Sequence, residues 1–126
     1  MSTVPYEKGT SLKVGKYVTI AKVPVGAVSL TLNLRFVLEN LSVAAKLRVA
    51  KVPETFNDET AEVPISGQWL QPIDTPLGTG GVKAGPDILK DEKIVLTAGS
   101  KIVAYADHGV GTGVTAQACG FARQTS

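Results

Sequence analysis

Residues 27–39, AVSLTLNLRFVLE, decide the fold, because an apolar side chain stands at nearly every second position. The apolar series is Val28, Leu30, Leu32, Leu34, Phe36 and Leu38, and the polar residues between them are Ser29, Thr31, Asn33, Arg35 and Glu39. Strict alternation over this length is typical of a β-strand with one buried face. Leu30, Leu34, Val37, Leu41 and Ala44 also fit helical spacing. Thr31 and Asn33 are poor helix formers, so we predict a strand.

The segments on either side of this strand carry the same kind of pattern. Residues 16–23, KYVTIAKV, predict a first strand that ends at the turn signals Pro24 and Gly26. Residues 43–52, VAAKLRVAKV, alternate again, with Leu47 and Val49 on the apolar face. We predict that this segment is the hairpin partner of residues 27–39.

The C-terminal part of the chain predicts further short strands. Two strand pieces are expected within 87–97, one in 101–107 and a last one in 114–122, the final two joined by a glycine-rich hairpin loop at 108–113. With no convincing amphipathic helix, about seven short strands predict an all-β fold. The expected architecture is an antiparallel β-sandwich or jelly roll.

Two segments do not look like regular strands. Residues 1–15 are polar and contain Pro5, Gly9 and Gly15, so we expect an N-terminal arm that orders on contact with a neighbour. Residues 53–86 are rich in proline and glycine, which predicts a long loop interrupted by a short strand near 61–65. The expected domain organisation is therefore an arm, 1–15, and one sandwich domain, 16–126.

Composition narrows the class of protein. The chain has 126 residues, 44% of them apolar, which suits one domain with one core. Its net charge is only +2, and basic residues are not interleaved with aromatic ones, which argues against a nucleic-acid partner. We expect no membrane partner and synthesis in a cytoplasm, because no apolar leader or spanning segment is visible.

The sequence contains few histidine and cysteine residues that could act as a catalytic nucleophile, a general base or a metal ligand. His108 is the single histidine and Cys119 the single cysteine, which is too few for a zinc site. The two could approach across the predicted last hairpin and form a Cys–His site, but the commoner outcome for such a cysteine is burial without reactivity. We therefore expect no catalytic residue, no cofactor and no metal site.

The candidate interface residues are apolar and lie mostly in the long loop. Trp69 is the single tryptophan, and a loop tryptophan either plugs the end of a sandwich or anchors an interface. Strand edges offer a second means of contact between chains. The interface candidates are Tyr6, Trp69, Leu70, Ile73 and Leu77.

The C-terminal third resembles a known class of proteins. The residues DEKIVLTAGSKIVAYA, 91–106, followed by VTAQACGF, 114–121, resemble the closing strands of small virion structural proteins of tailed bacteriophages. The segment Phe36-Val37-Leu38-Glu39-Asn40 fits the same scheme. The resemblance is one of pattern over roughly 80 residues and carries no functional residue. It implies a non-enzymatic, multicopy part of the particle, such as a capsid decoration (cement) protein or a tail, collar or fibre piece.

Three hypotheses follow from the sequence. The first is a virion structural protein that binds other virion proteins, such as major capsid or tail proteins, and forms homo-oligomers. The second is a carbohydrate- or ligand-binding β-sandwich, for which Trp69 and Tyr105 are the candidate stacking residues. The third is a hydrolase that uses Cys119 and His108.

Overall fold

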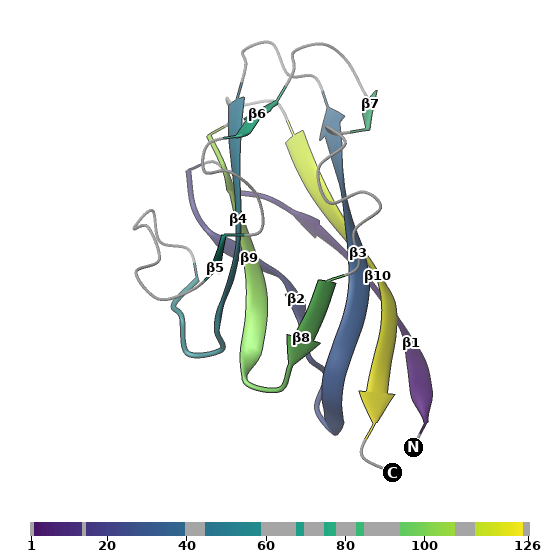
Figure 1. Cartoon of the computed structure of the whole chain (residues 1–126). Helices are drawn as coiled ribbons and strands as arrows, with labels where there is room; N and C mark the ends of the chain where they lie inside the picture. The colour runs from purple at the N-terminus through teal and green to yellow at the C-terminus, as the bar shows by residue number, and fades with distance from the viewer. Residues whose placement is uncertain are drawn as a thin grey trace.

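The computed structural model describes residues 2–13, 15–39, 45–58, 68–69, 75–77, 83–84, 94–107 and 113–124. All regular elements among them are strands (Figure 1). The strands are β1 (Thr3–Ser11), β2 (Val18–Lys22), β3 (Ala27–Glu39), β4 (Ala45–Pro53), β5 (Gln68–Trp69), β6 (Thr75–Leu77), β7 (Lys83–Ala84), β8 (Ile94–Thr97), β9 (Ser100–Ala106) and β10 (Gly113–Gln124). No helix long and apolar enough to cross a membrane occurs within these ranges.

The strands form two antiparallel sheets that face each other. Sheet A has the order β1-β10-β3, with β7 and β8 both pairing with β3. Sheet B has the order β2-β9-β4, with β5 and β6 both pairing with β4. The chain changes sheet between β1 and β2, between β2 and β3, and again at most later connections. The two facing antiparallel sheets confirm the predicted all-β sandwich, and their strand order is that of a jelly roll, the second architecture that the sequence left open.

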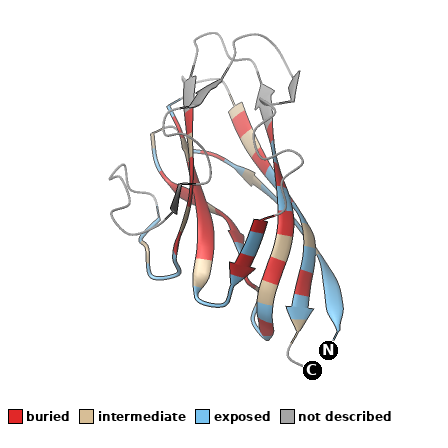
Figure 2. Cartoon of the chain, in the orientation of Figure 1, coloured by how far each residue is buried: buried red, intermediate tan, exposed pale blue. Residues whose placement is uncertain are grey.

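The core lies between the two sheets. Alternate residues of β3 and β10 point inward and are buried, which Figure 2 shows as red bands along these strands, whereas β9 is buried over most of its length. The inward residues with the largest side chains and almost no exposure include Leu30, Leu32, Leu34 and Phe36 of β3, Ile20 of β2, Leu47 of β4, Leu96 of β8 and Ile102 of β9. The contribution of β10 is mostly alanine, namely Ala116, Ala118 and Ala122.

The strand over residues 27–39 is confirmed with the boundaries expected from the alternation. Leu30, Leu32, Leu34 and Phe36 are all buried, whereas Val28 at the start of the strand is 37% exposed. The strands predicted in 16–23, 43–52, 101–107 and 114–122 are also present as β2, β4, β9 and β10.

Two predicted hairpins are wrong. β4 pairs with β9 in sheet B and not with β3, and β10 pairs with β3 and β1 in sheet A and not with β9. Alternation shows which face of a strand is buried. Strands of both sheets of a sandwich bury one face, so they show the same alternation. The pattern therefore does not say whether the next strand turns back beside its predecessor or crosses to the facing sheet.

The turn predicted at Ala98-Gly99-Ser100 is present, and it also crosses between sheets. Gly99 adopts a positive φ of 91°, a conformation that favours glycine. Its carbonyl accepts a hydrogen bond from the backbone N–H of Glu54 at 2.8 Å, and the N–H of Ala98 donates to the carbonyl of Val28 at 3.1 Å. The turn is thus bonded to both sheets.

The N-terminal arm needs correction. Residues 3–11 form β1, which pairs with β10 in register from Thr3 opposite Arg123 to Ser11 opposite Thr115. Most of its side chains are exposed, so the segment lacks the apolar alternation that marks the other strands (Figure 2). Whether it also binds a neighbouring chain stays a prediction.

Within the predicted long loop, the described residues form the short strands β5, β6 and β7. β5 and β6 lie at the edge of sheet B, where a proline such as Pro76 is tolerated. The predicted strand near 61–65 lies outside the described residues.

The outer face of sheet B is covered by a second, smaller apolar cluster. Tyr17, Ala50, Val52 and Val103 are buried there, and Phe56 and Tyr105 pack against them. The Tyr17 ring meets the Phe56 ring edge-on at 5.9 Å between centroids and lies 4.9 Å from the Tyr105 ring. The Arg48 guanidinium stacks over Tyr105 at 4.8 Å from its centroid.

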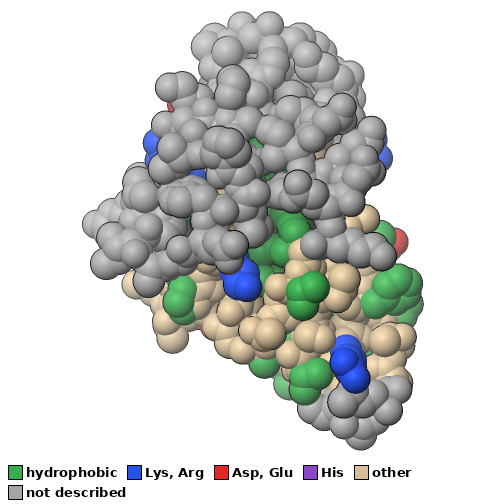
Figure 3. All heavy atoms as spheres, in the orientation of Figure 1, with side chains coloured by type: hydrophobic (Ala, Val, Ile, Leu, Met, Phe, Trp, Pro, Cys, Tyr) green, Lys and Arg blue, Asp and Glu red, His purple; other side chains and the backbone are tan. Residues whose placement is uncertain are grey.

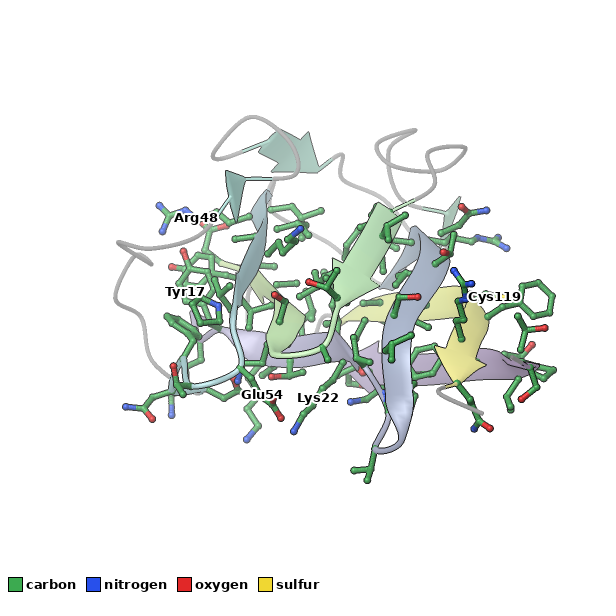
Figure 4. The ribbon with its side chains drawn as sticks, turned by 60° about the horizontal axis from the view of Figure 1, so that its bottom comes forward. Tyr17, Lys22, Arg48, Glu54 and Cys119 are labelled. Atoms are coloured by element: carbon green, nitrogen blue, oxygen red, sulfur yellow. The ribbon has the colours of Figure 1, made fainter. Side chains whose placement is uncertain are left out.

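An ion pair between buried Lys101 and the more exposed Asp58 holds the segment that follows β4 over this cluster. Lys101 of β9 is buried, and its Nζ donates to the Phe56 carbonyl at 2.7 Å and to Asp58 Oδ1 at 2.8 Å. Asp58 Oδ2 accepts from the N–H and the hydroxyl of Thr19 in β2. At the rim, Lys22 Nζ and Glu54 Oε1 pair at 2.7 Å between exposed side chains (Figure 4). Residues 54–58 thereby bridge β9 and β2.

Candidate functional site

The predicted interface residues do not gather in one place. Tyr6 lies in β1 of sheet A, whereas Trp69 and Leu77 belong to β5 and β6 of sheet B. The backbones of Trp69 and Leu77 lie along the same edge of β4, opposite Ala50 and Ala45. Leu70 and Ile73 lie outside the described residues.

Tyr6 is turned toward the protein interior. Its side chain is partly buried and packs against the main core. Its hydroxyl accepts a hydrogen bond from the backbone N–H of Lys22 in β2 at 3.3 Å, so the side chain spans the gap between the two sheets. The structure therefore gives Tyr6 a contact within the chain, and an interface role remains a prediction.

The outer edge of β1 is the most extended feature that sequence reasoning missed. The N–H of Gln124 donates to the Ser2 carbonyl, and the N–H of Leu12 donates to the Val114 carbonyl, each at 2.9 Å. Together with the continuous register between these bonds, they show that even-numbered residues of β1 bond to β10. The odd-numbered residues direct their backbone groups to the other side.

No described strand lies beyond that side of β1. Thr3, Glu7, Gly9 and Ser11 present N–H and carbonyl groups there, and Pro5 presents a carbonyl alone. Figure 1 shows β1 at the margin of its sheet, beside β10 and close to both chain termini. A proline whose missing N–H faces outward is typical of an edge strand, and Pro5 was the signal in the sequence that could have identified it.

A row that is apolar except for Thr31 crosses the outer face of sheet A beside this edge. The row follows the pairing of Pro5 with Phe121, of Phe121 with Thr31, and of Thr31 with Val95. Phe121 is 59% exposed and Val95 is 53% exposed. In Figure 3, separate hydrophobic side chains stand among polar ones over this sheet. We call these four residues the Phe121 row.

Next to the Phe121 row lies an open hollow of about 720 Å³. Its polar lining comes from three neighbouring strands, and Gly9 leaves the space where a side chain would stand. The lining residues with polar or sulfur-containing side chains are Glu7, Lys8, Asn33, Arg35, Gln117 and Cys119. Carboxylate, amide and guanidinium groups on one surface can bind polar ligands or peptide groups.

The proposed approach of Cys119 to His108 loses its basis. It relied on a hairpin between the last two strands, but β9 and β10 lie in different sheets. Cys119 is exposed on the outer face of sheet A, opposite Asn33, so the prediction of a buried thiol is wrong. Figure 4 shows it far from Tyr17 and Arg48, which lie at the outer side of sheet B. His108 lies outside the described residues.

The described residues also contain no group of three His, Cys, Asp or Glu side chains that could hold a metal ion. The clearest electrostatic feature of the described part is the Lys101–Asp58 pair. Burial alone would raise the pKa of Asp58, but hydrogen bonds from Lys101 and Thr19 and the charge of Lys101 outweigh it and lower that pKa. This pair holds residues 54–58 against sheet B.

Comparison with known proteins gives little information about the function of this chain. No family model matches the chain, and no curated protein matches its sequence. A chain in a solved structure titled "Structure of infectious bursal disease virus Gx strain" is similar at a TM-score of 0.34 and 14% sequence identity. The match covers 98% of this chain and 40% of that chain, so this protein spans less than half the length of the viral one. A similarity this weak carries no argument about function.

Proposed function

We propose that this chain is a structural component of a virus particle and acts by binding other protein chains. The observation that carries the proposal is the outer edge of β1, with its row of outward backbone groups beside the exposed Phe121 row. Proteins usually blunt or cover such edges, because an open edge accepts a strand from another chain. The jelly-roll wiring is compatible with this role, since viral capsid domains use it, although lectin domains do so as well.

The finer form of the proposal is a capsid decoration protein of a tailed bacteriophage. It is supported by the resemblance of residues 91–106 and 114–121 to closing strands of such virion proteins. A decoration protein stabilises the particle by bridging major capsid proteins, and it needs neither a catalytic site nor a cofactor. The alternative within the same class is a tail, collar or fibre piece.

The test of this proposal uses the virus whose genome encodes the chain. We expect mass spectrometry to find the protein in purified particles in many copies. Particles of a mutant virus in which the gene is deleted should release their genome at a lower temperature than wild-type particles. Supplying the wild-type chain in trans should restore heat resistance. Missing tails in the deletion particles would favour the tail alternative. Absence of the chain from purified particles would refute the virion role.

One observation favours a second candidate, a ligand-binding sandwich. The hollow beside Gly9 brings Asn33, Gln117 and Arg35 together on an exposed surface. Such side chains hydrogen-bond hydroxyl-rich ligands, although the hollow has no aromatic lining residue for a sugar to stack on. Binding on a glycan array that is lost in Asn33→Ala, but kept in Thr97→Ala on the same sheet face away from the hollow, would support this candidate.

A further inference from the structure

The outward side of β1 offers one uninterrupted run of backbone groups. From Glu7 to Ser11 every outward residue has both an N–H and a carbonyl, whereas Pro5 interrupts the donors nearer the N-terminus. An added strand can therefore form its full set of hydrogen bonds only along 7–11. The length of this run limits any partner to a short antiparallel or parallel strand.

Gly9 lies at the centre of the run, and the chain itself gives no reason for a glycine there. A Cβ at Gly9 would meet nothing within 4 Å, and Gly9 is not among the glycines of positive φ. Glycine inside a strand is destabilising, because it has no side chain to pack against its neighbours. Gly120 in β10 differs from Gly9, because a Cβ there would stand against the backbone of β3.

We propose that the strand added at this edge is β1 of a second copy, paired antiparallel with Gly9 opposite Gly9 of that copy. In an antiparallel pair the outward, odd-numbered residues must face one another. Centring the pair on Gly9 places Glu7 opposite Ser11 and Lys8 opposite Thr10 of the second copy. All the outward groups from 7 to 11 are then bonded, and no like charges stand directly opposite.

Other registers of the β1 pair are less favourable, because they bring like charges together or leave backbone groups without a hydrogen bond. Centring on Glu7 or Lys8 places that residue opposite its own copy, so that two like charges meet. Centring on Pro5 or Tyr6 brings Pro5 into the paired segment, where its missing N–H leaves carbonyls of the second copy without a donor. Centring on Thr10 leaves fewer outward groups of β1 bonded within the strand. Charge and hydrogen bonding thus select the Gly9 register.

Pairing in this register joins the two A sheets into one continuous sheet. The hollow beside Gly9 in one copy then lies next to the hollow of the other, because Glu7 and Gly9 line it. The Phe121 row of each copy stays exposed and extends away from the two-fold axis, since it includes Pro5 beyond the paired segment. The dimer retains two apolar rows for contact with other chains.

Sedimentation velocity on the full chain tests the pairing. We expect the wild type to show a concentration-dependent dimer. Gly9→Pro removes the central donor from both copies at a position where an added Cβ meets no atom of its own chain, and it should raise the dimer dissociation constant about tenfold or more. Gly9→Ala keeps the donor and should leave the dimer intact. Thr3→Pro is the matched control, because it removes an outward donor outside 7–11 and should also leave the dimer intact.

A cross-link tests the register. In a bonded antiparallel pair the Cα atoms of opposite residues lie about 5.5 Å apart, within the range that a disulfide spans. Gly9→Cys in a Cys119→Ser background should therefore form a disulfide-linked dimer on oxidation, and Lys8→Cys in the same background should form much less. Equal or preferred cross-linking through position 8 would overturn the register.

The remaining outcomes separate this inference from the proposed function on which it rests. A wild-type chain that stays monomeric at every concentration, or a dimer that Gly9→Pro and Thr3→Pro weaken equally, would overturn pairing through β1. If the outward amides of β1 were protected from exchange only after purified particles were added, the partner of this edge would be a different virion protein. That result would overturn self-pairing but support the virion role. A β1 dimer in a chain absent from particles would keep the pairing and refute the virion role.

Discussion

Gly120 in β10 has no space for a side chain, because the backbone of β3 passes close to it. A Cβ there would stand 1.9 Å from the Thr31 carbonyl oxygen and 2.7 Å from the Leu32 Cα, both backbone atoms of β3. Neither atom can move aside without separating β10 from β3. We expect Gly120→Ala to lower the free energy of unfolding in urea by about 2 kcal/mol or more.

Gly9→Ala is the matched control for that substitution, because the space around Gly9 is open. Its free energy of unfolding should stay the same or rise by up to about 1 kcal/mol. If both variants were equally stable, the close approach of β10 to β3 would be contradicted.

Asp58 gives the stability a defined dependence on pH. Its pKa in the folded protein is held below the ordinary value of 3.8, so the unfolded chain takes up the proton first as the pH falls. The pair with Lys101 therefore stabilises the fold above pH 3.8, and this contribution is lost as the pH falls through the lower folded pKa. Urea unfolding from pH 7 to pH 2 should show that loss.

Asp58→Asn should remove this part of the pH dependence. It should also lower stability at pH 7, because the buried Lys101 then keeps its charge without a carboxylate partner. Lys22 and Glu54 form the matched exposed pair, and Glu54→Gln should change the stability at pH 7 by less than about 1 kcal/mol. An unchanged acid transition in Asp58→Asn would contradict the assignment.

Cys119 is exposed, so its thiol should behave as a surface group. In the native protein it should react with a thiol reagent such as Ellman's reagent to completion without unfolding. Cys119→Ser should leave the free energy of unfolding within about 0.5 kcal/mol of the wild type. Slow labelling that requires denaturant would show a buried thiol, and a hydrolase activity lost in Cys119→Ser would revive the catalytic hypothesis.

At the scale of the strands, β1 should show alternating protection of its backbone amides. Under monomeric conditions the amide protons of Val4, Tyr6 and Lys8 should exchange slowly, because they face β10, and those of Glu7 and Gly9 should exchange fast. Hydrogen exchange followed by NMR measures both sets. Uniformly fast exchange along 3–11 would mean that the segment is an arm after all.

Which strands exist could be predicted from the sequence wherever one face is buried. β3 was found with its boundaries, because its leucines alternate with polar residues over its whole length. β1 was missed for the opposite reason, since its side chains are mostly exposed on both faces. The exposure of Cys119 was predictable in principle. The buried residues Ala116, Ala118 and Ala122 show that the even-numbered side chains of β10 face the core, and the odd-numbered Cys119 faces outward.

At the scale of the whole molecule, strand partners could not be predicted. Pairing between strands within a sheet depends on contacts between residues far apart in the chain, such as Thr3 with Arg123, and alternation contains no information about them. The edge of β1, the Phe121 row and the hollow all arise from these long-range pairings. The interface predicted from the sequence at Tyr6, Trp69, Leu70, Ile73 and Leu77 therefore rests on residue types and not on these pairings, and it stays a prediction.

The last strand should be indispensable to the whole molecule. A chain that ends at residue 112 lacks β10, which pairs with both β1 and β3. We expect it to show no cooperative unfolding transition in circular dichroism, whereas a chain that lacks only residues 125–126 should unfold like the wild type. A cooperative transition in the shorter chain would show that sheet B and β3 fold without β10.

The pairing of β1 with β10 also fixes when the protein can fold during its synthesis. β1 leaves the ribosome before β10, the strand with which it pairs, so sheet A cannot close until β10 has been synthesised. Until then β1 is an unpaired strand among other nascent chains, and on a crowded polysome its nearest β10 can belong to a neighbour. Copies translated side by side can therefore exchange strands before they finish folding. Slow or dilute synthesis should favour chains in which β1 pairs with β10 of the same copy.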